Sequence, residues 1–147
     1  MYTHLLVPVD GSELSERAAQ SSLELARKLG ASITGFVAEP MPPMPTMAAN
    51  VTAYQRDSEA HQARTEAHAH EVLARFAAKA AEAGVPFHGK YQRTDAVDDA
   101  IVKAAEEFGC DLVVMVTHGR GAFGELLFGS HTKNVLSRSK LPLLVLH

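Results

Sequence analysis

The stretch that most constrains the fold spans residues 111–132 and reads DLVVMVTHGRGAFGELLFGSHT. Its residues 112–116 are an unbroken apolar run between turn-forming residues, which is typical of a strand buried on both faces. The glycines that follow let the backbone adopt left-handed conformations and approach a ligand closely. Ser130 and Thr132 open the next predicted helix, and the free N–H groups at a helix start attract anions. The stretch therefore predicts a buried strand that leads into a phosphate-binding loop.

Two well-known phosphate-binding loops match this stretch only in part. Residues 119–124 fit the dinucleotide fingerprint G-x-G-x-x-G, but that fingerprint follows the first strand of its unit and needs an acidic residue about 20 positions later. No Asp or Glu follows Glu125. Residues 124–130 resemble half of a P-loop, yet Ser130 and His131 stand where a P-loop has its lysine and hydroxyl residue. Both types of loop are disfavoured.

Composition is typical of a single globular domain that spans residues 1–147, with 46% hydrophobic and 21% charged residues. The net charge of −3 predicts no general attraction to nucleic acid or to membranes. No apolar run approaches the roughly 18 residues that would span a bilayer. A single cysteine excludes an internal disulfide, and no export signal is recognisable, so the expected location is cytoplasmic.

Strand and helix patterns alternate along the chain, and they predict an α/β fold. The predicted strands are residues 5–9, 32–37, 87–92, 112–116 and 143–146, and the predicted helices are residues 14–29, 52–83, 96–108 and 129–139. Five strands alternating with four helices indicate a single doubly wound parallel sheet with helices on both faces. Residues 39–50 are rich in proline and methionine and form a predicted loop, which is either a linker or a lid over a ligand.

The glycine spacing resembles the nucleotide-binding loop of the universal stress protein family. That pattern is Gly, two residues, Gly, nine residues, Gly and then Ser or Thr. Here Gly119 is followed after nine residues by Gly129 and Ser130, while Val116 stands at the position of the first glycine. Residues 6–12, LVPVDGS, are also similar to the family's N-terminal signature. The segment at residues 94–97 departs from the family by lacking its glycine and proline.

The resemblance implies a Rossmann-like fold of the adenine-nucleotide alpha-hydrolase type, with strand order 3-2-1-4-5. The carboxyl ends of the first and fourth strands then lie side by side, at the switch point where ligands bind in such sheets. It also implies that adenine lies near Pro8, Asp10 and Val37, and that phosphate lies near the loop and Ser130. The implied nucleotide-binding residues are Pro8, Val9, Asp10, Val37, Met115, Val116, His118, Gly119, Arg120, Gly129, Ser130, His131 and Thr132.

Each of these assignments has a purely structural alternative. Asp10 could cap the following helix, with Glu13 completing a capping box. The glycines before Ser130 could form only a tight turn and a capped helix. His118 and Arg120 could be solvated loop residues.

Other reactive side chains do not combine into a recognisable site. His61, His68 and His70 lack the spacing of zinc ligands, so a solvated helix face is expected for them. Cys110 is expected to be a small core residue. No catalytic constellation is recognisable, and neither a catalytic residue nor a protein-built metal site is assigned.

The leading hypothesis is a stress-response protein that binds ATP, ADP or AMP and acts as a ligand-responsive homodimer. A Mg²⁺ or Mn²⁺ ion is expected to accompany ATP, held mostly by phosphate oxygens and water. Pairing between copies is expected along the apolar edge strand Leu143–Leu146. The alternative is a dimeric interaction module of the same fold that binds no nucleotide, which Val116 favours. Slow ATP hydrolysis is a weaker third hypothesis, because no P-loop lysine is present.

Overall fold

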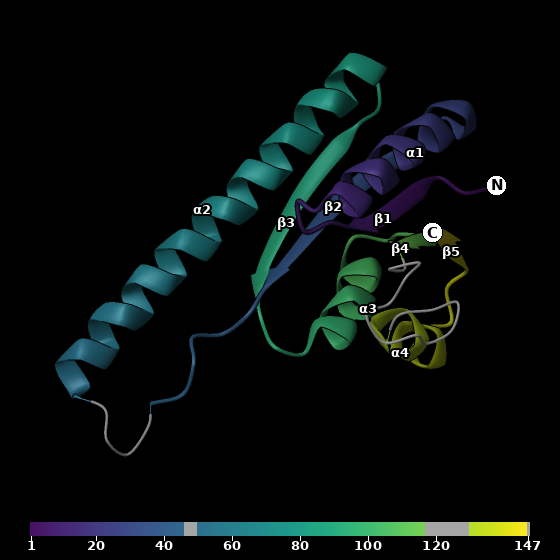
Figure 1. The fold of residues 1–147 in the computed structure, drawn as a ribbon. Coiled ribbons are helices and arrows are strands. Elements are labelled where there is room, and N and C mark those ends of the chain that lie inside the picture. The colour runs from purple at the N-terminus through teal and green to yellow at the C-terminus, as the bar shows by residue number, and fades with distance from the viewer. Residues whose placement is uncertain (46–49, 117–129, 147) are drawn as a thin grey trace.

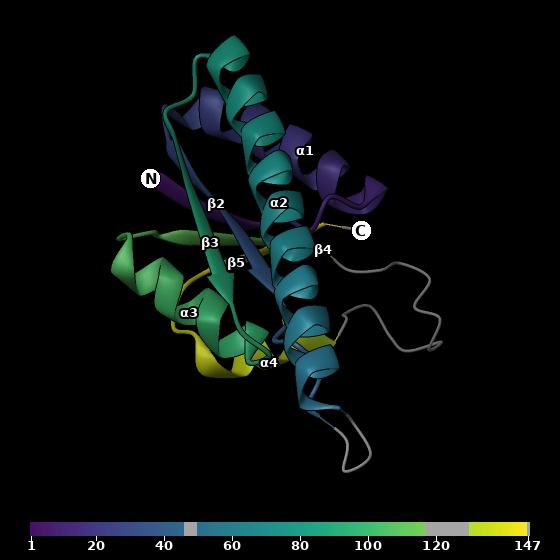
Figure 2. The ribbon, with the colours of Figure 1, turned by 90° about the vertical axis from the view of Figure 1, so that its left-hand side faces the viewer.

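The computed structural model describes residues 1–45, 50–116 and 130–146, which build one five-stranded sheet with helices on both faces (Figures 1 and 2). The strands are β1 (His4–Pro8), β2 (Ser32–Glu39), β3 (Phe87–Arg93), β4 (Leu112–Val116) and β5 (Leu143–Leu146). The helices are α1 (Glu13–Leu29), α2 (Val51–Ala83), α3 (Val97–Glu107) and α4 (Ser130–Arg138). All neighbouring strands are parallel, in the order β3-β2-β1-β4-β5. The predicted fold class and strand order are confirmed.

Alternation along the central strands divides the core into two layers. Leu5 and Val7 of β1 lie in the layer between the sheet and helices α1 and α2, whereas Leu6 lies in the layer covered by α3 and α4. All three side chains are fully buried, because a parallel sheet between two helical layers has no solvent-facing side. This arrangement explains why the strand sequences read as continuous apolar runs.

Helix α1 begins and ends at residues suited to those positions. The Ser12 side chain accepts a hydrogen bond from the Ser15 N–H, and Gly30 ends the helix with a left-handed φ of 67°. The alternative prediction that Asp10 caps this helix is wrong. Asp10 lies two residues before the cap, and its Oδ1 instead accepts from the Ser12 N–H at 2.9 Å, closing an Asx turn. Glu13 is then the first helical residue, too early to complete a capping box.

Helix α2 is 33 residues long, and its two halves have different surroundings. Its buried residues are Ala69, Val72, Phe76 and Ala80, all in the second half, where the helix covers β2 and β3. The first half runs past the end of the sheet, beside the segment that follows β2 (Figures 1 and 2). His68 and His70 are exposed, as predicted for a solvated face, while His61 is half-buried.

The described residues contain neither a metal-ligand cluster nor a membrane-spanning helix. No group of three His, Cys, Asp or Glu side chains in residues 1–45, 50–116 and 130–146 is arranged to hold a metal ion. Within the same residues, no helix combines the length and apolar character that a membrane crossing requires.

The amino-terminal ends of β1 and β4 are joined through Asp111. Its carboxylate accepts hydrogen bonds from the Thr3 N–H at 2.9 Å, the Thr3 hydroxyl at 2.9 Å and the His4 N–H at 3.0 Å. Partial burial acts to raise the pKa of Asp111, but these hydrogen bonds outweigh it and hold the pKa below its usual value. The ionised carboxylate therefore stabilises the β1–β4 pairing.

We predict that Asp111→Asn destabilises the protein by about 1–2 kcal/mol at neutral pH, because an amide offers one acceptor oxygen to three donors. A carboxyl group whose folded-state pKa is lowered stabilises the fold above its unfolded value of 3.8, and this contribution is lost as the pH falls through the folded value. Urea unfolding at pH 7 and near pH 2 measures both effects. The control is Asp57→Asn at an exposed position of α2, and equal midpoints for the two variants at pH 7 would contradict the prediction.

We also predict that the Cys110 thiol is unreactive in the folded protein. The residue is buried, and burial raises its pKa from 9.0 to about 11. Ionisation alone then slows its reaction with Ellman's reagent at pH 8 by about a hundredfold relative to a free thiol. Native protein should release almost no chromophore until urea unfolds it, and rapid labelling without unfolding would show that the thiol is accessible.

Candidate functional site

A cavity of about 250 Å³ opens at the carboxyl ends of β1 and β4. This is the switch point of the sheet, because the chain after β1 continues into α1 on one face and the chain after β4 continues into α4 on the other face. Ligands of open α/β folds bind at such a point. The lining residues come from β1 and the turn that follows it, from β2 and β4, and from the starts of α1 and α3. They are Pro8, Val9, Asp10, Ser12, Leu14, Ser15, Phe36, Ala38, Val97, Ile101, Met115 and Val116.

Five of the predicted nucleotide-binding residues meet at this cavity. Pro8, Val9 and Asp10 come from the end of β1, while Met115 and Val116 come from the end of β4. These two groups of residues are more than 100 positions apart in the chain, and the parallel pairing of β1 with β4 brings them together. Met115 is buried and Val116 is half-buried. The valine at the first glycine position of the family pattern therefore forms part of the cavity wall.

Asp10 supplies the carboxylate of this cavity, and it is held by hydrogen bonds from three directions. Its N–H donates to the Ser15 Oγ at 2.9 Å, and its Oδ1 accepts from the Ser12 N–H. Its carbonyl oxygen accepts from the His68 Nε2 of helix α2 at 3.0 Å. The other carboxylate oxygen, Oδ2, accepts no hydrogen bond from the described residues. Asp10 therefore offers a positioned acceptor to a ligand hydroxyl or amino group.

The alternation of β2 decides which of its side chains reach the cavity. Phe36 and Ala38 line it, but the fully buried Val37 side chain packs into the layer under α1 and α2, on the opposite face of the sheet. The side chain of Val37 thus adds nothing to the cavity wall. Its expected contact with adenine, which is made through the backbone, stays a prediction.

Helix α1 points its amino terminus at the cavity, with Ser12 and Ser15 among the lining residues. The unpaired N–H groups of a helix start carry a partial positive charge and favour an anion or an electron-rich group nearby. One wall of an otherwise apolar cavity is therefore polar, and the carboxylates of Glu13 and Glu16 in the same turn oppose the positive charge of the helix start.

The predicted phosphate-binding loop falls largely outside the described residues. His118, Gly119, Arg120 and Gly129 belong to residues 117–129, whose placement is not described. Helix α4 begins at Ser130 and includes His131 and Thr132 in its first turn, as the sequence predicts. The roles of all these residues in binding phosphate stay predictions.

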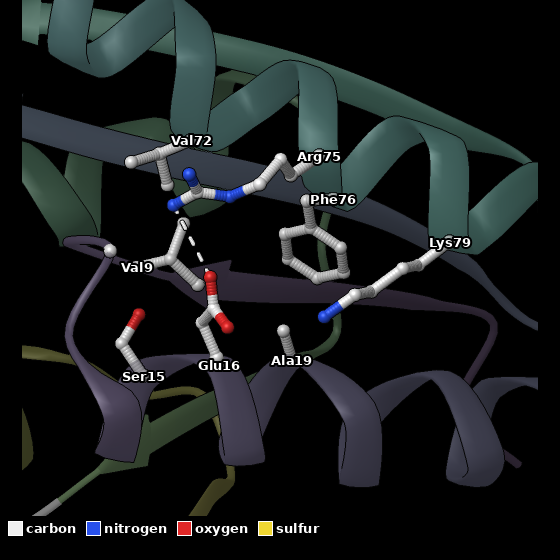
Figure 3. A pocket seen from close by; sticks show the side chains of 9 residues that line it. Val9, Ser15, Glu16, Ala19, Val72, Arg75, Phe76 and Lys79 are labelled. Carbon is white, nitrogen blue, oxygen red and sulfur yellow. Dashed lines mark ion pairs between the residues drawn. The ribbon is translucent and has the colours of Figure 1, made fainter.

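A second, much smaller cavity lies behind the Asp10 turn, between α1 and α2 (Figure 3). Its volume is about 20 Å³, which suffices for roughly one water molecule. Arg75 of α2 and Glu16 of α1 form an ion pair of 3.2 Å across it, and Lys79 extends toward it from the next turn (Figure 3). This cavity is too small for a ligand, and it marks where α2 is tied to α1.

The described part of the Pro/Met-rich segment does not line the cavity at the switch point. Pro43, Met44 and Pro45 instead line a separate groove of about 480 Å³ with the first half of α2. The Met41 N–H donates to the Asp95 carboxylate at 3.0 Å, which ties the segment to the loop before α3. The described residues 40–45 thus lie beside α2. They do not support the hypothesis that this segment is a lid over the ligand.

Several lining residues escaped the sequence-based prediction. Phe36 and Ala38 could have been found from strand alternation, because both lie on the same face of β2 as the buried Thr34. Val97 and Ile101 could only be read as core positions of α3, since their approach to the cavity depends on how that helix packs. The contact from His68 to Asp10 spans 58 positions and left no local signal.

Comparisons with known proteins agree with this geometry. The model of the universal stress protein family matches residues 1–147. A universal stress protein of Thermus aquaticus is 31% identical over 147 residues, covering 99% of this chain and 98% of the relative. Among solved structures, a universal stress protein of Lactobacillus plantarum has a TM-score of 0.81 at 21% identity, covering 99% of this chain and 98% of that one.

One further structure concerns a ligand. A universal stress protein solved in complex with cAMP is 25% identical and has a TM-score of 0.69, covering 99% of this chain and 97% of that one. The sheet order, the cavity at its switch point and the match along the whole sequence agree. The chain belongs to the universal stress protein family.

Proposed function

We propose that this universal stress protein binds an adenine nucleotide in the cavity at the ends of β1 and β4. The observation that carries the proposal is the convergence of Pro8, Val9, Asp10, Met115 and Val116, selected from sequence alone, around one cavity of about 250 Å³. The cAMP complex of a relative supports an adenine nucleotide as the ligand class. The protein would act in the cytoplasm as a ligand-responsive dimer and not as an enzyme.

The chemistry of the cavity suits the nucleoside part of such a ligand. Phe36, Ile101 and Met115 offer apolar walls to a flat base, as in most small-molecule sites. Asp10 Oδ2 would accept a hydrogen bond from a ribose hydroxyl. Phosphate groups would extend toward Gly119, Gly129, Ser130 and Thr132. With ATP, a Mg²⁺ or Mn²⁺ ion would be held mainly by phosphate oxygens and water.

The second candidate function is a dimeric interaction module that leaves the cavity without nucleotide. The observation that favours it is Val116, whose β-branched side chain takes up space in the cavity wall where the family pattern has glycine. Slow ATP hydrolysis is the least supported option, because Asp10 is the one carboxylate among the described lining residues and it is engaged in the turn.

We predict micromolar binding of MgATP, ADP or AMP to the wild-type protein, measured by isothermal titration calorimetry. Val116→Gly should bind about tenfold more tightly, a gain of roughly 1.4 kcal/mol, because backbone and ligand can approach more closely. The matched control is Val51→Gly, at a valine that is 70% exposed at the start of α2.

Three outcomes of this titration can be told apart. Binding by the wild type supports the nucleotide-sensor function. Absence of binding by the wild type, with binding by Val116→Gly, shows that valine closes the site and favours the interaction module. Absence of binding by both proteins contradicts the proposed function.

We also predict that the protein is a homodimer paired along β5. This strand lies at the edge of the sheet, and its residues Leu143–Leu146 are all apolar and half-buried. An apolar strand at the edge of a sheet invites pairing with a second copy. Val145→Lys should shift the dimer toward monomer in light scattering at micromolar concentration, because a charge on each edge repels its symmetry mate. Val51→Lys is the control, and a wild-type monomer would overturn the prediction.

A further inference from the structure

We propose that His68 of helix α2 is a positioning residue for the ligand site, which it serves by holding the turn at Asp10 and Gly11. The expected effect of His68 on ligand binding rests on the proposed nucleotide function. The contacts of His68 with the turn are present in the structure without a ligand. The consequence of the proposal is that the long helix α2 is coupled to the cavity.

The first observation is the hydrogen bond from His68 to the backbone of the site. Its Nε2 lies 3.0 Å from the carbonyl oxygen of Asp10. A carbonyl oxygen can only accept, so Nε2 must carry the proton. The hydrogen bond requires only an N–H donor at this distance, so another side chain with such a donor can replace imidazole.

The second observation is the tight contact of Gly11 with α2. Gly11 has a φ of 83°, which strongly favours glycine. A Cβ atom placed there would lie 2.8 Å from Val72 Cγ2 and 3.1 Å from His68 Cε1. The turn is therefore pressed against one face of α2, with no space for even a methyl group between them.

The third observation concerns the elements to which hydrogen bonds connect Asp10. Its other two hydrogen bonds, with Ser12 and Ser15, are local, because both partners lie within five positions of Asp10 in the chain. Of the three bonds described for Asp10, the one from His68 alone reaches a distant element. It therefore ties the turn to α2, in addition to the bond of 2.8 Å from the Val9 N–H to the Phe36 carbonyl that ties the preceding residue to β2.

The position of His68 along α2 gives the contact its wider significance. Ala69, the next residue, is the first buried residue of the helix, and the half before it runs past the sheet. His68 thus lies where α2 meets the body of the protein, about two helical turns before Arg75. The ion pair of Arg75 with Glu16 ties α2 to α1 (Figure 3). A ligand that orders Asp10 will also favour one placement of α2, and the reverse holds by thermodynamic linkage.

The test compares His68→Ala with His68→Gln, whose amide N–H can still donate to the Asp10 carbonyl. The control is His70→Ala, an exposed histidine that contacts Glu66 and the Tyr91 ring instead. Calorimetric titration with ATP and AMP should show about fivefold weaker binding for His68→Ala, the loss of one hydrogen bond. His68→Gln and His70→Ala should remain within about twofold of wild type.

A ligand-free measurement separates this inference from the proposed function. The ¹³C shift of the Asp10 carbonyl reports its hydrogen bond, and hydrogen exchange of the Ser12 amide reports the order of the turn. Both should change in His68→Ala and be preserved in His68→Gln. If the wild type binds no nucleotide, the proposed function fails and these two readouts still decide the inference.

The inference is overturned by either of two results. One is a His68→Ala protein with wild-type carbonyl shift, amide exchange and, where nucleotide binds, affinity. The other is a His68→Gln protein as impaired as His68→Ala, because the donor would then not explain the effect. Thermal unfolding of each variant checks that the fold is intact, and His68→Gln keeps the test valid if His68→Ala is unstable.

Discussion

The parallel pairing of β1 with β4 is the constraint on which the rest of this structure depends. The two strands are separated by two strands and three helices in the sequence, so the pairing closes a long loop at an entropic cost. Apolar side chains buried on both faces offset this cost, and Asp111 adds charged hydrogen bonds at the amino-terminal edge. At the opposite edge, the same pairing brings the Asp10 turn next to Val116.

The cavity is consequently shared among elements that do not form a unit in the sequence. Pro8 comes from β1 and Asp10 from the turn after it, while β4 supplies Met115 and α3 supplies Ile101 in the same core layer. Each wall belongs to an element whose main role is to pack the core. The chemistry of the site is concentrated in the few residues after the strand ends, where backbone groups are not used by the sheet.

Helix α2 shows how one element can serve both stability and the site. Its second half buries Val72 and Phe76 against the sheet, as its apolar pattern indicates. The face that continues into the first half carries Tyr54, Ser58 and His61, and it lies against the proline-rich segment rather than the sheet. Ser58 Oγ and His61 Nε2 are buried and have no hydrogen-bond partner among the described residues. The neighbouring prolines cannot supply one through a backbone N–H, because proline has none. The contact from His68 to Asp10 marks the boundary between the two halves.

The sequence by itself determined the fold class, the strand order implied by family resemblance, and five residues of the cavity. Apolar runs located β4 and β5 at their observed bounds, because both the buried strand β4 and the half-buried edge strand β5 consist of apolar residues between turn-forming ones. Only the tertiary structure decided that Ser12 and not Asp10 caps α1, that Val37 turns its side chain away from the cavity, and that His68 holds the Asp10 turn. These depend on backbone geometry and on contacts across long stretches of chain, which no local pattern encodes.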